Sequence, residues 1–92
     1  MNASPRPLAR NFRLITGQGN LRAFCDVQCG PWTIRGIRII QQGGQRPYAA
    51  LPQQQGKDGR WYPVIECGDK QLEAAIKAEA LDFWASEVGA TL

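Results

Sequence analysis

One stretch of the chain, residues 21–29, alternates strictly between two sets of side chains. Leu21, Ala23, Cys25, Val27 and Cys29 occupy the odd positions, and Arg22, Phe24, Asp26 and Gln28 occupy the even ones. A repeat of two is typical of a β-strand with one buried face. The sequence has 92 residues, which fits a single domain with a thin core. The chain is therefore expected to fold around a sheet that contains this half-buried strand.

Turn residues separate this strand from four other predicted strands. These lie at Phe12–Ile15, Trp32–Gln41, Tyr48–Leu51 and Trp61–Glu66. Residues 53–59 are expected to form a polar loop whose final Asp58-Gly59 pair is a strong hairpin signal. Pro63 cannot donate a ladder hydrogen bond, which indicates an edge position for the fifth strand. Because the connections are short, we predict an antiparallel meander of about five strands.

Gly36 interrupts the third predicted strand. Strict alternation would place Ile34 and Ile37 on opposite faces, so we expect a β-bulge at Gly36. Arg35 and Arg38, three residues apart, would point to opposite faces of a regular strand. The same bulge would bring both arginines to one face.

The last part of the sequence predicts a helix over about residues 70–88. Asp69 can cap its first turn, Glu73 and Lys77 form an i,i+4 pair, and Gly89 is the expected stop. Its apolar stripe consists of Leu72, Ile76, Ala80 and Phe83. Packing of this stripe on one face of the sheet gives an α+β fold. We expect a flexible arm over residues 1–9, a single domain over 10–88 and a tail over 89–92. A second copy can pair the sheet edges, which predicts a homodimer.

Charge is distributed unevenly along the chain. Residues 1–40 carry six Arg and one Asp, a net charge of +5, whereas residues 66–92 carry two Lys and six Asp or Glu, a net charge of −4. Arginine is the side chain best matched to phosphates and to base edges. Charge by itself leaves open whether these arginines bind a polyanion or form a solvated surface.

Neither catalysis nor metal binding finds support in the sequence. The chain has no histidine, so a cysteine nucleophile lacks its usual base and a zinc site lacks ligands. The odd count of three cysteines fits a reducing cytoplasm, and Cys25 and Cys29 are expected to be small buried hydrophobes. No run approaches the roughly 18 apolar residues of a membrane span. We expect a cytoplasmic protein that is not an enzyme and binds no cofactor, metal or small-molecule substrate.

Several short motifs occur in a fixed order along the chain. They are Leu21-Arg22-Ala23, Ile34-Arg35-Gly36-Ile37-Arg38-Ile39-Ile40, Tyr48-Ala49-Ala50-Leu51-Pro52, and Asp58-Gly59 followed by Trp61 and a final helix. This order, over about residues 12–84, resembles the bacterial SpoVG family of septation and sporulation regulators. The resemblance implies an antiparallel sheet with a C-terminal helix, a homodimer, and DNA or RNA binding in transcriptional or post-transcriptional control. The chain departs from the family pattern at Gly36, where an aspartate is usual. It also departs at Gln54 and Gln55, which replace two cations of a basic run tied to nucleic-acid contact.

Two groups of residues are candidates for nucleic-acid contact. Arg35 and Arg38 would bind phosphates, or would be solvent-exposed charges or partners of Asp26 and Glu66. The second group consists of Arg46, Lys57, Arg60, Trp61 and Tyr62, and Gln54 and Gln55 are further candidates beside it. In it, cations and aromatics are interleaved as in proteins that bind a backbone and stack bases, and glutamine can pair with adenine but neutralises no phosphate.

The alternative for the second group is that Trp61 is a core aromatic covered by its neighbours. The other two tryptophans, Trp32 and Trp84, are expected to be packing residues.

Two functions follow from the sequence. The first is a dimeric nucleic-acid-binding regulator. The alternative is a protein-interaction module of the same fold that has lost the basic loop.

Overall fold

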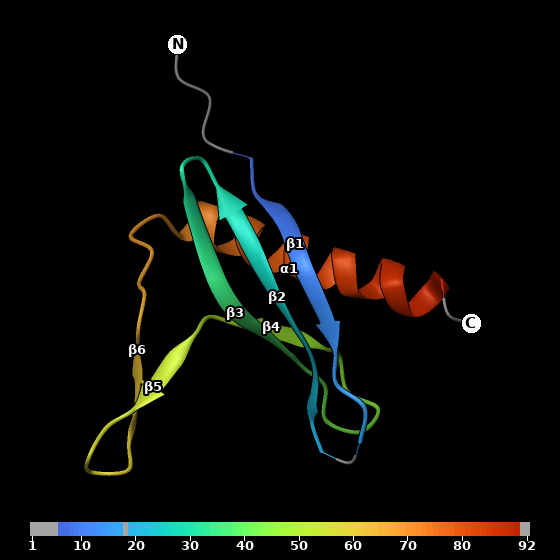
Figure 1. The fold of residues 1–92 in the computed structure, drawn as a ribbon, viewed down its shortest axis with the longest axis horizontal. Coiled ribbons are helices and arrows are strands. Elements are labelled where there is room, and N and C mark those ends of the chain that lie inside the picture. The colour runs from blue at the N-terminus through green and yellow to red at the C-terminus, as the bar shows by residue number, and fades with distance from the viewer. Residues whose placement is uncertain (1–5, 18, 91–92) are drawn as a thin grey trace.

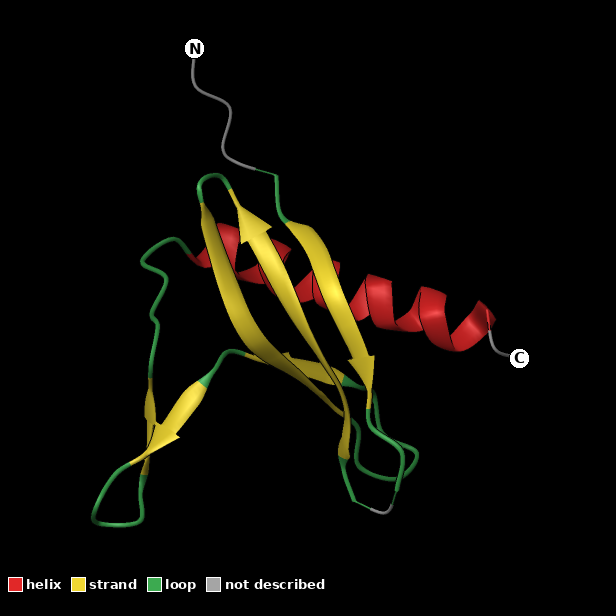
Figure 2. Cartoon of the chain, in the orientation of Figure 1, coloured by secondary structure: helices red, strands yellow, loops and turns green. Residues whose placement is uncertain are grey.

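The computed structural model of the chain describes residues 6–17 and 19–90. It contains a four-stranded sheet with the order β1-β2-β3-β4, a two-stranded sheet of β5 and β6, and one C-terminal helix (Figure 1). The elements are β1 (Leu8–Leu14), β2 (Leu21–Cys29), β3 (Trp32–Ile40), β4 (Tyr48–Ala50), β5 (Gln53–Gln55), β6 (Trp61–Pro63) and α1 (Lys70–Ala90). All strand pairs are antiparallel. The predicted α+β fold is confirmed, with α1 packed on one face of the four-stranded sheet (Figure 2).

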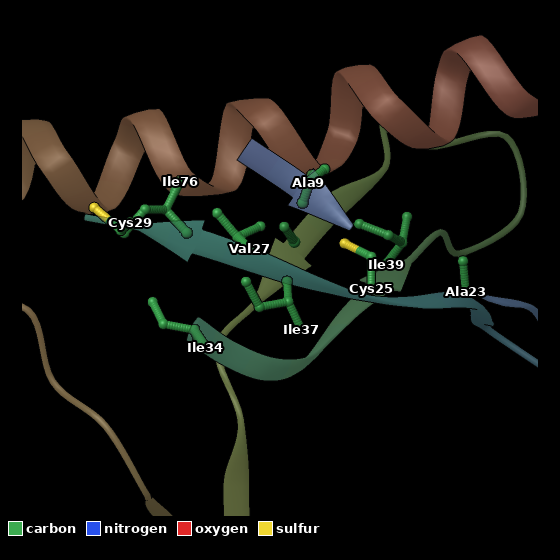
Figure 3. Close-up of a cluster of buried hydrophobic side chains, with 11 residues drawn as sticks. Ala9, Ala23, Cys25, Val27, Cys29, Ile34, Ile37, Ile39 and Ile76 are labelled. Carbon is green, nitrogen blue, oxygen red and sulfur yellow. The ribbon is translucent and has the colours of Figure 1, made fainter. Parts of the chain in front are cut away.

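The core lies between the four-stranded sheet and α1 (Figure 3). Its largest fully buried side chains are Ile37, Ile39, Val27 and Cys25, all from the two central strands. The helix contributes Ile76 and Ala80, which are also buried, and partly buried Leu72 and Phe83 pack beside them. The predicted apolar stripe of the helix is therefore confirmed as the surface that covers the sheet.

The β-bulge expected at Gly36 is present. Val27 pairs with Ile34 and Cys25 pairs with Ile37, so three steps along β3 match two steps along β2. Gly36 has a φ of 80°, a left-handed conformation that glycine adopts without a Cβ clash. The extra residue keeps Ile34, Ile37 and Ile39 on the buried face.

Hydrogen bonds cap the start of α1 and join its middle to the sheet. Asp69 Oδ1 accepts hydrogen bonds from the backbone N–H groups of Gln71 at 3.0 Å and Leu72 at 3.2 Å, which confirms the predicted N-cap. Further along, Glu79 Oε2 accepts a hydrogen bond from the Ala9 N–H at 2.9 Å and so ties α1 to β1. Within the described part of the chain, no helix has the length and apolar content needed to cross a membrane.

The sheet differs from the predicted five-stranded meander at both ends. Strand β1 begins at Leu8 rather than at Phe12, because Ala9 is buried against the core. The predicted fifth strand does not join the main sheet: β6 pairs with β5, inside the segment expected to be a polar loop. The Asp58-Gly59 turn explains this outcome, since it brings two exposed glutamine-rich and aromatic segments together without any need for a buried face. Gly89 is not the stop that the sequence predicts, because α1 continues through it to Ala90. Residues 1–5, most of the expected N-terminal arm, and residues 91–92 lie outside the described residues.

The buried Cys25 thiol makes the stability of the protein depend on pH above pH 9. Burial, with smaller contributions from Asp26 and Glu79, raises the pKa of Cys25 from 9.0 to about 11. Between these values the unfolded chain has lost a proton that the folded chain keeps, so the free energy of unfolding is expected to fall as the pH rises from 9 to 11. Urea unfolding across this range should show a weaker pH dependence for Cys25→Ala than for the wild type. Equal dependence in the two proteins would contradict a shift at Cys25.

Candidate nucleic-acid interface

The face of the sheet opposite α1 carries a row of paired residues from four strands. Arg13 of β1 pairs with Phe24 of β2, Phe24 pairs with Arg38 of β3, and Arg38 pairs with Ala50 of β4. Directly paired residues of antiparallel strands project from the same face. Phe24 therefore lies between two arginines on the uncovered side of the sheet, which we call the open face.

A shallow hollow of about 320 Å³ lies next to Phe24 on this open face. It is lined by Asn11, Arg13, Phe24, Asp26, Arg35 and Gly36. Asp26 connects two irregular positions, Asn11 in β1 and Gly36 in β3. Its Oδ1 accepts a hydrogen bond from the Gly36 N–H at 3.1 Å, and its Oδ2 accepts one from Asn11 Nδ2 at 2.9 Å. Asn11 has a φ of 52° at the register shift in β1, and Gly36 has a positive φ at the shift in β3. Two bulges held by one carboxylate thus shape the hollow.

The bulge at Gly36 has the effect on the arginines that the sequence predicts. Arg35 lines the hollow beside Phe24, and Arg38 pairs with Phe24, so both lie on the open face. No atom lies within 4 Å of the position a Cβ would take on Gly36. The backbone beneath the arginines is therefore accessible to a ligand.

The guanidinium groups of the open face are not neutralised by carboxylates. Within residues 6–17 and 19–90, one ion pair is present, and it joins Lys77 to Glu73 of the helix at 2.9 Å. Arg10, which pairs with Asp26 in the ladder, donates to Gln28 Oε1 at 2.6 Å. Arg38 donates to Gln53 Oε1 at 3.3 Å. The alternative in which Arg35 and Arg38 form ion pairs with Asp26 and Glu66 is thus wrong.

The uneven charge of the sequence becomes a difference between the two layers of the fold. Four arginines and one aspartate lie on the open face: Arg10, Arg13, Arg35, Arg38 and Asp26. The helix on the other side carries four acidic residues and two lysines. A polyanion would therefore meet favourable charge on the open face and unfavourable charge on the helix.

The second candidate group lies largely on a projecting hairpin, residues 52–64 (Figure 1). Gln54 pairs with Tyr62 and Gln55 pairs with Trp61, and the Val64 N–H closes the hairpin by donating to the Pro52 carbonyl at 3.1 Å. Lys57 and Arg60 are exposed at its tip. Trp61 is 58% exposed, so the interpretation of Trp61 as a core aromatic is wrong.

Two hydrogen bonds fix the tip of the hairpin. The Tyr62 hydroxyl donates to Asp58 Oδ2 and the Arg60 N–H donates to Asp58 Oδ1. The bond from Tyr62, helped by the one from Arg60, lowers the pKa of Asp58, and the same bond raises the pKa of Tyr62. The hairpin therefore holds its shape by contacts within itself.

The structure does not bring all the predicted residues into one site. Arg46 is exposed in the loop before β4, whereas the hairpin begins after β4. Trp84 packs against the core as expected, but Trp32 is 75% exposed and is not a packing residue. The one side-chain hydrogen bond between the open face and the hairpin joins Arg38 to Gln53, among the residues that the structure describes.

Sequence reasoning missed Arg10, Arg13 and Phe24 as parts of the site. The signal for Phe24 is the alternation of residues 21–29, which places it opposite the small apolar residues. No comparable signal exists for Arg13, since its face depends on the bulge at Asn11. Neither a scan against protein-family models nor a search of the curated proteins finds a match to this chain.

Proposed function

We propose that this chain is a nucleic-acid-binding regulatory protein that holds single-stranded DNA or RNA against the open face of its sheet. The observation that carries the proposal is the cross-strand row in which Arg13 and Arg38 flank Phe24. An aromatic ring on an uncovered sheet face stacks on any unpaired base, and neighbouring arginines neutralise the backbone phosphates. The regulatory role rests on the resemblance to the SpoVG family.

The hollow beside Phe24 supports a bound base in addition to a bound backbone. Its volume of about 320 Å³ is at the lower end of the range for small-ligand pockets. Asp26 and Asn11 line the hollow with a carboxylate and an amide group, and such groups form hydrogen bonds with base edges. Substitution of the family's basic run by Gln54 and Gln55 is compatible with this proposal, because the open face supplies its own cations.

The salt dependence of binding distinguishes the open face from the hairpin. Arg35→Ala/Arg38→Ala and Lys57→Ala/Arg60→Ala each remove two positive charges, so the pair is matched in net charge. Fluorescence anisotropy with labelled single- and double-stranded DNA and RNA should be measured across a salt series. We expect the first variant to flatten the log–log slope by about one to two units, roughly one for each phosphate that is no longer neutralised. The second variant should retain the wild-type slope.

Two results would contradict the proposal. If the hairpin variant flattened the slope and the open-face variant did not, the binding surface would be the hairpin. If no probe bound more tightly than about 100 μM at physiological salt, the weak end of non-specific binding, nucleic-acid binding would be excluded. The second candidate function, a protein-interaction module, would then be favoured by the exposed aromatic residues of the hairpin, Trp61 and Tyr62.

A further inference from the structure

The hollow beside Phe24 contains a carboxylate that no cation neutralises. Asp26 lines this hollow together with two arginines, Arg13 and Arg35. In the part of the chain that the structure describes, neither arginine lies within ion-pair distance of Asp26. The hollow therefore holds a negative hydrogen-bond acceptor and positive donors that do not satisfy one another. A ligand with both donors and acceptors on its edges would satisfy both kinds of group.

Asp26 retains the capacity to accept further hydrogen bonds. An ionised carboxylate has about four acceptor positions on its two oxygens. The Gly36 N–H and Asn11 Nδ2 occupy one position on each oxygen, so about two positions remain. The same two bonds hold the carboxylate in place, and a group that is already positioned loses little freedom when a ligand binds. Asp26 is only partly buried, so a ligand can reach it.

Phe24 places a stacked base within reach of this carboxylate. Phe24 and Asp26 are two residues apart on β2, so they project from the same face about 7 Å apart along the strand. A base stacked on the Phe24 ring can therefore direct one edge toward Asp26. Gly36 adds no side chain to the hollow, and no atom lies within 4 Å of the position that its Cβ would take. This absence leaves room for the edge of a base.

We infer that the hollow is a guanine-selective subsite, in which Asp26 accepts hydrogen bonds from the N1–H and 2-amino groups of an unpaired guanine stacked on Phe24. The inference rests on the proposed function and names the base that the open face prefers within a single strand. Guanine carries two adjacent donors on its Watson–Crick edge, and these match the two oxygens of a carboxylate. Its O6 and N7 are acceptors that arginine binds, and Arg13 and Arg35 supply the donors.

The other common bases fit this combination less well. Adenine and cytosine each place one donor beside a ring-nitrogen acceptor on the Watson–Crick edge, and that acceptor would face the Asp26 carboxylate. Uracil and thymine place their one donor between two acceptors. Each of these bases therefore forms one hydrogen bond with Asp26 and brings a lone pair against its second oxygen. Such a repulsive contact contributes to selectivity as much as the attractive contacts do.

The test is fluorescence anisotropy with labelled single-stranded thymidine oligomers of about nine nucleotides, a length within the range of known single-strand site sizes. The central position carries guanine, adenine, cytosine, thymine or hypoxanthine. The guanine oligomer should bind about 5- to 150-fold more tightly than the adenine oligomer, the usual discrimination from one bidentate pair. Hypoxanthine is guanine without the 2-amino group, so its oligomer should bind at least about fivefold more weakly than the guanine oligomer.

Asp26→Asn removes one of the two matched acceptors but keeps an oxygen for the Gly36 N–H. The ratio of guanine to hypoxanthine affinity should fall to within about twofold of one, because the amide has a single acceptor oxygen. Asp82→Asn is the matched control, since it removes the same charge from an exposed position of α1, and it should retain the wild-type ratio. A purely structural role of Asp26 would weaken the binding of all oligomers alike and leave this ratio unchanged. The hypoxanthine comparison in the wild type tests the inference even if Asp26→Asn fails to fold.

Each failure has its own result. If no oligomer binds more tightly than about 100 μM at physiological salt, the proposed function is wrong and the guanine subsite with it. If all oligomers bind with equal affinity, single strands bind without selection of guanine, and the inference alone is overturned. A guanine preference that persists in Asp26→Asn would remove Asp26 from the recognition of the base. Free guanosine monophosphate should displace the guanine oligomer less well than the unlabelled oligomer does at equal concentration, and equal displacement would show that the ligand is a free nucleotide rather than a strand.

Discussion

Replacement of Phe24 by leucine is expected to weaken the binding of single-stranded nucleic acid by roughly 5- to 150-fold, because one stacked base contributes about 1–3 kcal/mol. Leucine keeps most of the volume of the half-buried ring but has no aromatic face. The slope of log affinity against log salt should stay at its wild-type value, because Phe24 carries no charge. This pattern is the opposite of that expected for Arg35→Ala/Arg38→Ala, in which the slope itself changes.

Phe24→Trp is the matched variant for this prediction. It retains an aromatic face at the same position of β2, and its affinity should remain within about threefold of the wild type, since stacking tolerates any aromatic ring. Anisotropy titrations of the three proteins at one salt concentration, followed by a salt series, measure both effects. Equal affinities for Phe24→Leu and the wild type would remove Phe24 from the proposed site.

Replacement of Ile37 by alanine is expected to lower the free energy of unfolding by roughly 2–5 kcal/mol, the usual cost of truncating a fully buried isoleucine. Ile37 is 0% exposed and belongs to the core between the sheet and the helix. A domain of this size has a total stability of about 5–15 kcal/mol, so the loss is a large share of it. The thermal midpoint should fall by about 8–40 °C, at about 4–8 °C for each kcal/mol in a domain of this size.

Ile40→Ala is the control, because Ile40 has the same side chain on the same strand but is only half-buried. Its cost should be about 1 kcal/mol. The comparison also tests the bulge at Gly36, which places Ile37 on the covered face. Chemical denaturation of both variants measures the difference. An equal loss of stability in both would contradict the assignment of the two faces.

The central strand, the bulge in its neighbour and the C-terminal helix could be predicted from local sequence, because local physical chemistry decides them. The alternation of residues 21–29 can bury one face only as a strand, and the four-residue spacing of Leu72, Ile76 and Ala80 gives one face only on a helix. Gly36 indicates the bulge because a residue with positive φ is strained unless it is glycine. These signals need no knowledge of distant residues, and all three predictions are confirmed.

The pairing of the last two strands could not be predicted in the same way. Gln53–Gln55 has no apolar alternation and all three residues are exposed, so the burial pattern that identifies a strand is absent. Its partner, Trp61–Pro63, is rich in aromatics, and this composition predicts a place at the edge of the main sheet. The position of a strand with exposed aromatic residues depends on which other surface packs against them. A short window of sequence does not contain this information.

The candidate site likewise has some features that the sequence predicts and others that depend on the tertiary structure. The sequence by itself determined that the first half of the chain is arginine-rich and that Phe24 lies opposite the small apolar side chains of its strand. Only the tertiary structure decided that Arg13 and Arg38 flank Phe24, because their alignment depends on register shifts in β1 and β3. It also decided that Arg46 lies apart from Lys57 and Arg60. Periodicity determines which face a residue takes within one strand, whereas neighbours across strands are set by bulges and by the packing that holds them in register.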